Sequence, residues 1–275
     1  MVTNEKKRKP NLRRLGAQRS SLYLVPISLA LAIALWALIV RLANIPPVIL
    51  PGPGLVWRRF LQVLMDGSLL RHSMYTLFEV LAGLILGGGM ASILGYLLAK
   101  SVAIERVLAP YIVASQSVPT VAIAPLLIIW FGSGPFSKVL ICALIVFFPI
   151  LVNTIVGIRS VPDELRDLMR SLLATRWQTF TRLEVPAASP VFLGGLKVGA
   201  TLSVIGAVVG EFVGADRGLG YMISRSRGQY DTALVFVAVL TLVLMAMALY
   251  GSVVWLESHL LAWSKKPEKP ILSEK

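Results

Sequence analysis

Six long apolar runs, separated by short polar segments, dominate the pattern of hydrophobic positions along the chain. They cover residues 22–40, 74–99, 107–131, 137–158, 190–212 and 232–256. Each run is close to the ~20 residues that a helix needs to cross a hydrocarbon core of about 30 Å. Because backbone groups inside lipid must pair within their own segment, such runs form helices. The pattern therefore predicts an all-α membrane protein with six transmembrane helices.

Small residues recur at four-residue spacing in the second and fifth runs, which places them on one face of a helix. They are Gly83, Gly87, Ala91 and Gly95 in the second run, and Gly195 with Gly199 and Gly206 with Gly210 in the fifth. Such a face lets helix backbones approach closely. We expect both helices to pack tightly against their neighbours.

The third run differs from the others because it combines prolines with polar side chains. Its prolines are Pro110, Pro119 and Pro125, and its polar residues are Ser115, Gln116, Ser117 and Thr120. Polar groups at mid-membrane depth are tolerated only against protein or a wet cavity. Two interpretations remain open: the segment lines a solute path, or it is a kinked helix whose hydroxyl groups bond to its own carbonyls.

The predicted outer segments are short and patterned. Residues 45–53 are rich in proline and must be extended or turning, because proline disfavours helix at the preceding residue. Residues 55–65 predict a short amphipathic helix, and residues 214–221 predict a turn that leads into a short surface or re-entrant helix.

Composition and charge agree with a membrane protein and orient it. The chain of 275 residues is 56% hydrophobic and 15% charged, with a mean hydropathy of +0.76. Its net charge of +13 falls in short segments between apolar runs, so it does not predict nucleic-acid binding. With the N-terminus inside, the cytoplasmic segments hold 18 basic residues and the outer ones hold 8, which predicts cytoplasmic termini. We expect a basic cytoplasmic tail (residues 1–20), a transmembrane domain (21–260) and a second cytoplasmic tail (261–275).

Residues that could carry catalysis or bind a metal are sparse. The lone Cys142 lies inside an apolar run, and His72 and His259 lie far apart near span ends. Residues 132–138 look superficially like a phosphate loop but lack the G-x-x-x-x-G-K-[ST] spacing. The sequence therefore predicts no catalytic centre, no cofactor and no metal site. Glu79 and Glu211 lie near the predicted outer ends of their spans, where we expect them to form hydrogen bonds at the interface.

The longest predicted cytoplasmic segment, residues 160–189, begins with an amphipathic helix. Ser160 can cap it, Pro162 suits its first turn, and the acidic residues that follow complement the helix dipole. One apolar stripe is formed by Leu165, Leu168, Met169, Leu172 and Leu173.

A second helix is predicted within the same segment. Thr175 and Gln178 form a capping-box pattern at its start, and we expect Pro186 to end it before the next span. The helix pair could lie on lipid, as its arginines would allow, or dock on a partner protein. Carboxylates mixed through the segment favour the partner protein.

Motifs spread in order over residues 22–260 resemble a known family. They are Leu50-Pro51-Gly52-Pro53, Thr76 with Gly83, Gln116-Ser117-Val118-Pro119, Ala124-Pro125-Leu126, Trp130-Phe131-Gly132-Ser133-Gly134 with Lys138, Phe148-Pro149, and Glu211-Phe212 through Gly218-Leu219-Gly220-Tyr221. Together with residues 160–189 they resemble permease subunits of binding-protein-dependent ABC importers, particularly the nitrate, sulfonate and taurine branch. The family calls this cytoplasmic segment the EAA loop. Here Asp167-Leu168-Met169 replaces Glu-Ala-Ala, and Leu173 replaces the usual glycine.

The resemblance implies a type I ABC importer permease fold and a homodimer in the bacterial plasma membrane. It also implies a cytoplasmic ABC ATPase dimer, which hydrolyses ATP, and an extracytoplasmic solute-binding protein. The ATPase-coupling residues would be Asp163, Glu164, Asp167, Arg170, Leu173, Arg176, Trp177 and Phe180. The translocation path would include Ser115, Gln116, Ser117, Pro119, Thr120 and Glu211.

The sequence of residues 167–172, DLMRSL, most resembles that of a sub-branch of permeases for vitamins or their precursors, such as thiamine pyrimidine precursors or riboflavin. Nitrate, sulfonates and taurine are the other substrates that the resemblance suggests. An ion-gradient-driven secondary transporter is the main alternative function, but it would use deep carboxylates and an inverted repeat. A membrane-embedded enzyme would need paired catalytic groups at one depth.

Overall fold

The computed structural model describes the backbone of residues 12–116 and 118–261, and it describes side chains from residue 26 onward except at positions 102, 113, 115 and 116. Its elements are α1 (Leu12–Leu42), α2 (Pro53–Met65), α3 (Ser68–Lys100), α4 (Val102–Gln116), α5 (Thr120–Phe131), α6 (Pro135–Arg159), α7 (Asp163–Ser171), α8 (Arg176–Thr179), the π-helical turn η1 (Phe180–Glu184), α9 (Val185–Gly214), α10 (Leu219–Gly228) and α11 (Thr232–Leu260). The all-α fold expected from the apolar runs is confirmed.

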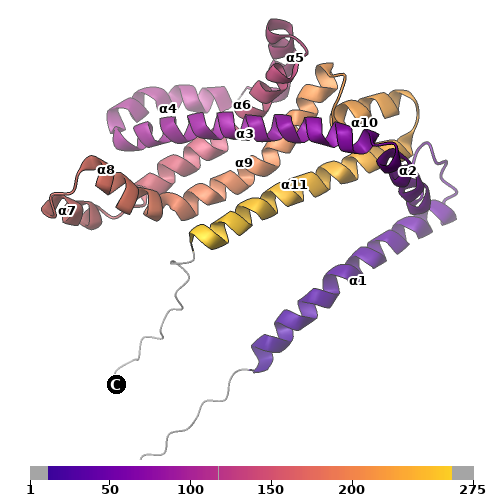
Figure 1. Ribbon diagram of the computed structural model, residues 1–275, viewed down its shortest axis with the longest axis horizontal. Helices are drawn as coiled ribbons and strands as arrows, with labels where there is room; N and C mark the ends of the chain where they lie inside the picture. The colour runs from indigo at the N-terminus through magenta and orange to yellow at the C-terminus, as the bar shows by residue number, and fades with distance from the viewer. Residues whose placement is uncertain (1–11, 117, 262–275) are drawn as a thin grey trace, which may run out of the picture.

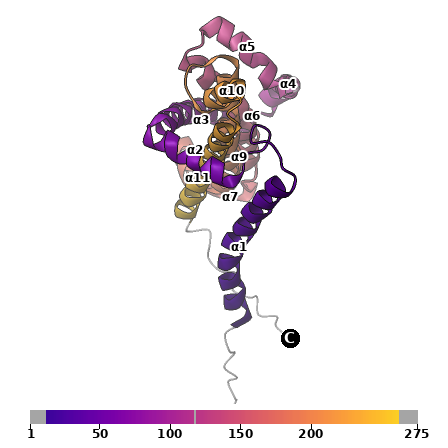
Figure 2. The same cartoon turned by 90° about the vertical axis from the view of Figure 1, so that its right-hand side faces the viewer.

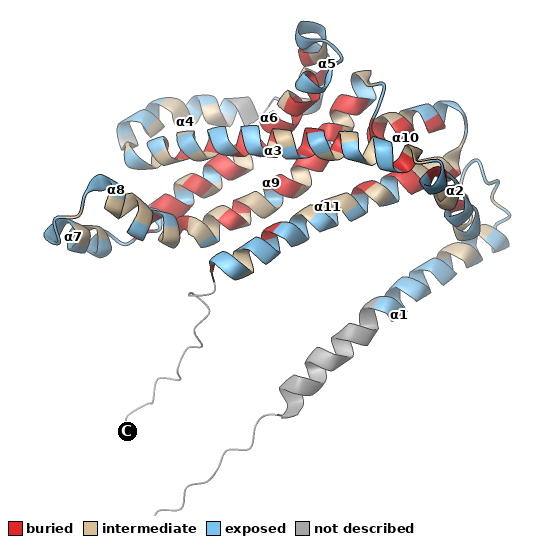
Figure 3. Cartoon of the chain, viewed as in Figure 1, coloured by how far each residue is buried: buried red, intermediate tan, exposed pale blue. Residues whose placement is uncertain are grey.

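Four helices within the described residues are long and apolar enough to cross a membrane. They are Ser68–Lys100, Pro135–Arg159, Arg176–Gly214 and Thr232–Leu260, and shorter apolar helices cover Pro26–Leu42 and Thr120–Phe131. Most outward-facing positions on these helices are exposed apolar side chains, which suits contact with lipid (Figure 3).

Helices α3, α6 and α9 form the centre of the bundle, with α6 packed against both of the others (Figure 1). A Cβ atom at Gly83 would lie 2.2 Å from the Cβ of Cys142, and one at Gly87 would lie 2.3 Å from the carbonyl oxygen of Ala143. The backbones of α3 and α6 therefore touch along the glycine face, as its four-residue spacing predicts. Val146 and Ile150 fill the core further along α6, toward α7.

Helix α2 matches the expected amphipathic segment and ties two distant parts of the chain together. Val56 and Val63 are its buried residues, and an ion pair of 2.6 Å joins Arg59 to Asp231 at the start of α11. Helix α1 leans away from the bundle in both ribbon views (Figures 1 and 2), although Trp36 stacks on Phe236 of α11 at 5.5 Å.

The run expected as one span over residues 107–131 is divided into two helices. Helix α4 ends at Gln116, and α5 begins after Pro119, which is extended with φ −61° and ψ 111°. Proline disfavours helix at the residue before it, so the break lies at Pro119. Pro110 and Pro125 are accommodated inside their helices.

Two groups of short segments lie at opposite ends of α3. Glu184 of η1 forms an ion pair with Lys100 at one end, and the backbone amide of Gly218 donates to His72 near the other. Figure 1 shows this separation, with α7 and α8 on the left and α10 on the right. One helix therefore connects the two polar regions of the molecule.

Candidate functional site

The segment between α6 and α9 begins with helix α7. Asp163 and Glu164 lie in its first turn, where a negative charge is favoured by the helix dipole. Two ion pairs of 2.9 Å follow its surface, from Arg166 to Asp163 and from Arg170 to Asp167. Both pairs join residues three apart within α7, so they stabilise its turns without burying the helix.

The capping expected of Ser160 is corrected by the structure. The N-cap residue of α7 is Pro162, and no side chain caps it. Ser160 belongs to the last turn of α6, where its hydroxyl donates to the Gly157 carbonyl at 2.8 Å. A hydroxyl used within the preceding helix cannot reach the amides of the next one.

The apolar stripe of α7 is uncovered in the described part of the chain. Leu165, Leu168 and Leu172 are 42%, 53% and 68% exposed, and α7 has no buried residue. An exposed apolar stripe on a helix outside the bundle is typical of a docking surface.

Leu173 ends α7 in a conformation that favours glycine. Its amide donates to the Arg170 carbonyl at 2.9 Å and the amide of Ala174 donates to the Met169 carbonyl at 3.0 Å, which together form a Schellman motif. Leu173 is the C′ residue of this motif and has φ +52°, in the left-handed region. A residue with a Cβ pays roughly 1–2 kcal/mol there. The resemblance, which places a glycine at this position, agrees with this geometry.

The second helix starts as the capping-box pattern predicts and then continues further than expected. The amide of Gln178 donates to the Thr175 hydroxyl at 3.2 Å, and the amide of Thr175 donates to the Gln178 side chain at 2.8 Å. The expectation that Pro186 ends this helix is wrong, because the chain stays helical from Arg176 to Gly214.

A π-helical turn explains how the helix passes Pro186. In this turn the amide of Val185 donates to the Phe180 carbonyl, five residues back. Pro186 then falls in the first turn of α9, where a missing amide donor costs little. Helix α8 is therefore a direct extension of the membrane-spanning helix α9.

Glu184 joins this segment to α3 and was missed by the sequence analysis. Its side chain is 1% exposed, forms an ion pair with Lys100 and accepts a hydrogen bond of 3.2 Å from the Tyr96 hydroxyl. The Nε atom of Arg166 in α7 lies 4.0 Å away. A buried carboxylate requires such partners. The signal that could have revealed it is an acidic residue between Leu183 and Val185 at the edge of an apolar run.

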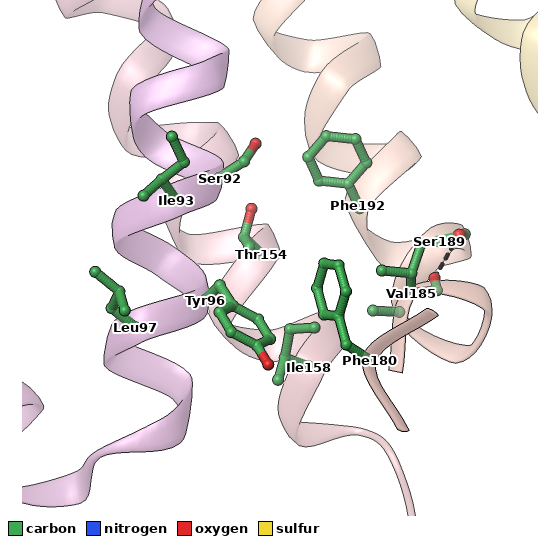
Figure 4. A pocket seen from close by; sticks show the side chains of 11 residues that line it. Ser92, Ile93, Tyr96, Leu97, Thr154, Ile158, Phe180, Val185, Ser189 and Phe192 are labelled. Atoms are coloured by element: carbon green, nitrogen blue, oxygen red, sulfur yellow. Dashed lines mark hydrogen bonds between the residues drawn. The ribbon is translucent and has the colours of Figure 1, made fainter. Parts of the chain in front are cut away.

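An apolar cavity of about 350 Å³ lies beside Glu184, between α3, α6 and the start of α9. Figure 4 shows Tyr96 and Phe180 side by side in its lining, where their rings meet edge to face with centroids 5.0 Å apart. The ring centre of Trp177 lies 5.6 Å from that of Phe180, and Trp177 is 70% exposed. Aromatic side chains thus link the exposed surface of α8 to the interior of the bundle.

The structure places the eight residues expected to contact an ATPase on one surface segment. All are exposed except Phe180, which is half-buried at the cavity. They are Asp163, Glu164, Asp167, Arg170, Leu173, Arg176, Trp177 and Phe180.

The residues expected in a translocation path are not all brought together. Pro119 and Thr120 lie at the break between α4 and α5, with Pro119 exposed and Thr120 half-buried. Ser117 and the side chains of Ser115 and Gln116 lie outside the described residues. Glu211 is 2% exposed in α9, far along the chain from this break.

Glu211 fills an internal site between α3, α9 and α10. Its carboxylate accepts a hydrogen bond of 2.7 Å from Thr76 and another from the amide of Gly220, so its hydrogen bonds form inside the bundle. A Cβ atom at Gly218 would lie 2.2 Å from this carboxyl group. The glycines therefore make room for the acid. Glu79 is also buried, and its Oε2 atom has no hydrogen-bond partner among the described residues.

Comparisons with known proteins agree with this architecture. Residues 83–262 match the family described as "Binding-protein-dependent transport system inner membrane component". The chain is 47% identical to the riboflavin transport system permease protein of Chloroflexus aurantiacus over 239 residues, which cover 87% of this chain and 89% of that protein. It is 37% identical to the formylaminopyrimidine transport permease protein of Halalkalibacterium halodurans, covering 84% and 92%.

A solved structure shares the fold. An inward-facing form of the methionine ABC transporter contains a chain that aligns with a TM-score of 0.62 and 17% identity, covering 71% of this chain and 97% of that one. This likeness supports the type I ABC importer permease fold.

Proposed function

Because this chain belongs to the family of binding-protein-dependent transport system inner membrane components and is a permease subunit of an ABC importer, we propose that it imports a vitamin or a vitamin precursor. Riboflavin is the leading candidate, supported by 47% identity to a riboflavin permease over most of both chains. A formylaminopyrimidine is the second candidate, supported by 37% identity. Nitrate, sulfonates and taurine are the remaining alternatives.

A separate ABC ATPase dimer supplies the energy in this proposal and binds the surface formed by α7 and α8. The observation that carries this assignment is the unbroken helix from Arg176 to Gly214, which starts on that surface and continues across the bundle. The uncovered stripe of α7 and the exposed Trp177 offer the partner an apolar contact area. The acidic and basic side chains around them add charge complementarity.

The mechanical step follows from the same contacts. Closure of the ATPases on ATP displaces α7 and α8, and the continuous helix carries this displacement into α9. Glu184 carries it into α3 through Lys100 and Tyr96. Two such subunits, related by two-fold symmetry in a homodimer, would then rock between inward and outward states.

We place both termini and the α7–α8 surface in the cytoplasm of a bacterium, and we place α10 at the outer face, where a solute-binding protein delivers the solute. The path passes the α4–α5 break near Pro119 and Thr120, where backbone groups are released from regular helix pairing. Glu211 contributes to the path by fixing α10 instead of touching the solute.

Uptake into proteoliposomes tests the proposal. The permease, its ATPase and its binding protein are reconstituted together, and uptake of labelled riboflavin is measured with ATP and with a non-hydrolysable analogue. We expect uptake with ATP alone, competed by unlabelled riboflavin and not by taurine. Uptake that continues without ATP and stops with an uncoupler would instead identify a gradient-driven transporter.

A further inference from the structure

His72 joins the start of α10 to α3. The backbone amide of Gly218, the N-cap residue of α10, donates to Nδ1 of His72 at 3.0 Å. A backbone amide can only donate, so Nδ1 is the acceptor, and an imidazole nitrogen accepts only while it carries no proton. The half-buried ring of His72 is therefore neutral in this contact, with its proton on Nε2.

The next two amides of α10 also use side-chain acceptors. The amide of Leu219 donates to the Thr76 hydroxyl at 2.8 Å, and that of Gly220 donates to the Glu211 carboxylate. The first amides of a helix have no acceptor within the helix, so these contacts fix α10 against the start of α3 (Figure 1).

Among these three acceptors, imidazole is the one that ordinarily takes up a proton between pH 8 and pH 5. A hydroxyl group does not titrate in this range, and a carboxyl group keeps an acceptor oxygen even after protonation. Nδ1 of a protonated imidazole accepts nothing. Acid therefore removes the acceptor of the Gly218 amide and leaves the acceptors of the following two amides in place.

Arginines from every element around His72 line the two cavities beside it. They are Arg59 of α2, Arg71 of α3, Arg217 of the loop after α9 and Arg225 of α10. Arg59 forms an ion pair of 2.6 Å with Asp231. The other three would repel a positively charged ring, as would the positive end of the α10 dipole.

Acidic residues and tyrosines line the same two cavities. They are Asp66, Asp216, Tyr75 and Tyr221. Neither aspartate forms an ion pair with His72 in the part of the chain that the structure describes, and the Tyr221 ring lies against the imidazole with centroids 5.7 Å apart. The two carboxylates offset part of the positive charge, but they do not replace the acceptor of the Gly218 amide.

We propose that His72 is a pH-sensitive latch, which holds the first turn of α10 while the ring is neutral and releases it when the ring is protonated. Protonation sets an N–H of the ring against the N–H of Gly218, so the hydrogen bond is lost and two donors face each other. Protons therefore bind the released state more tightly than the latched state, and acid favours release.

The side from which the latch is operated follows from the position of α10. Because the proposed function places α10 at the outer face, and this part of the inference rests on that function, the pH outside the cell controls His72. Release loosens the surface where the solute is delivered. Acid outside the cell should therefore slow uptake.

Hydrogen exchange of the permease–ATPase complex in nanodiscs tests the latch. Protection of the amides of residues 218–220, corrected for the intrinsic pH dependence of exchange, is compared at about pH 8 and about pH 5.5. His72→Asn is the informative variant, because its side-chain oxygen can accept from the same amide and does not titrate. His259→Asn is the matched control, since His259 is the other of the two histidines and bonds within α11.

We expect acid to lower the protection of these amides at least about fivefold in the wild type and in the control, as for one lost hydrogen bond, and to change it little in His72→Asn. Equal protection of the wild type at both pH values would overturn the latch. A fall of the same size in His72→Asn would also overturn it, because another group, such as Asp66 or Glu211, would then cause the response.

A measurement on the unaltered ring covers the case in which His72→Asn does not fold. In the His259→Asn protein only His72 remains, so its imidazole nitrogens are assigned directly in a ¹⁵N NMR spectrum. We expect an unprotonated Nδ1 at about pH 8 and a protonated one at about pH 5.5. A protonated Nδ1 at the higher pH would refute the latch.

Uptake into proteoliposomes separates the latch from the proposed function. ATP-driven uptake of labelled riboflavin should slow more in the wild type than in His72→Asn when the pH at the outer face is lowered. Equal slowing of the two proteins would refute the control of transport by His72. If hydrogen exchange shows the pH response but no ATP-driven uptake occurs at any pH, the latch stands and the proposed function alone is refuted.

Discussion

The carboxylate of Glu211 in α9 accepts a hydrogen bond of 2.7 Å from the Thr76 hydroxyl of α3, although 135 positions separate the two residues. The same hydroxyl accepts a hydrogen bond of 2.8 Å from the amide of Leu219. Thr76 and Glu211 thus fix the start of α10 to two membrane-spanning helices, α3 and α9.

Removing the Thr76 hydroxyl should destabilise the bundle. Thr76→Val leaves both the Glu211 carboxylate and the Leu219 amide without one partner, which costs about 1–3 kcal/mol for a buried polar group. Thermal unfolding of the purified protein in detergent measures the effect as a lower Tm. Thr241→Val is the control, because Thr241 bonds only to the Val237 carbonyl of its own helix. An unchanged Tm for Thr76→Val would refute this account.

A side chain at Gly218 should be poorly tolerated. Gly218 has φ +111°, and a Cβ atom there would lie 2.2 Å from the Glu211 carboxyl group. We expect Gly218→Ala to lower the free energy of unfolding by about 1–3 kcal/mol, as at other strained or overpacked sites. The effect is measured as a lower Tm. Gly228→Ala, which meets nothing within 4 Å, serves as the control. In the double variant Gly218→Ala with Glu211→Ala the clash is removed, so the two effects should be less than additive.

Glycine at position 173 should stabilise the end of α7. Leu173→Gly removes the left-handed strain, and its net gain is up to about 1 kcal/mol after the entropy cost of glycine. Hydrogen exchange at the amides of Leu173 and Ala174, which close the Schellman motif, should slow. Leu173→Ala keeps the Cβ atom and should not show this protection. Faster exchange in the glycine variant would contradict the strain argument.

The ion pair of buried Glu184 and exposed Lys100 should behave as a unit. Glu184→Gln leaves Lys100 without its counter-charge, and the Tyr96 hydroxyl loses a charged acceptor. Because the charge that remains is exposed to solvent, we expect a cost of about 1 kcal/mol. We expect a lower Tm and less uptake per ATP hydrolysed.

The double variant Glu184→Gln with Lys100→Met removes both charges and should recover much of the Tm. It should not recover the coupling ratio if the ion pair carries movement into α3. Full recovery of both the Tm and the uptake per ATP hydrolysed would show that the pair has only a structural role.

Asp167 should matter for partner binding more than for folding. Its carboxylate is 66% exposed and pairs only with Arg170 one turn away, so Asp167→Ala should change the Tm little. Co-purification of the ATPase and uptake should both fall, as should those of a variant lacking residues 176–178. Asp216→Asn, an exposed acid at the opposite end of the molecule, should leave ATPase co-purification intact. If Asp167→Ala formed the complex as well as the wild type does, Asp167 would not belong to the proposed contact surface.

Features that depend on near neighbours in the chain could be predicted from the sequence. The apolar runs identify the helices, the Thr175–Gln178 capping box forms as expected, and the glycine spacing marks the α3 face that touches α6. Each of these features is set within a few residues, because helix geometry places positions three and four apart on one side.

Only the tertiary structure determines which distant residues pair at the helix ends. Glu184 finds Lys100 across 84 positions and Glu211 finds Thr76 across 135, and no local pattern encodes either pair. Local rules also misplaced the ends of two helices: Pro186 is absorbed by a π-helical turn, while Pro119 divides a run of spanning length. A proline ends a helix only where the surrounding packing does not compensate for its lost amide, and that packing is a property of the assembled bundle.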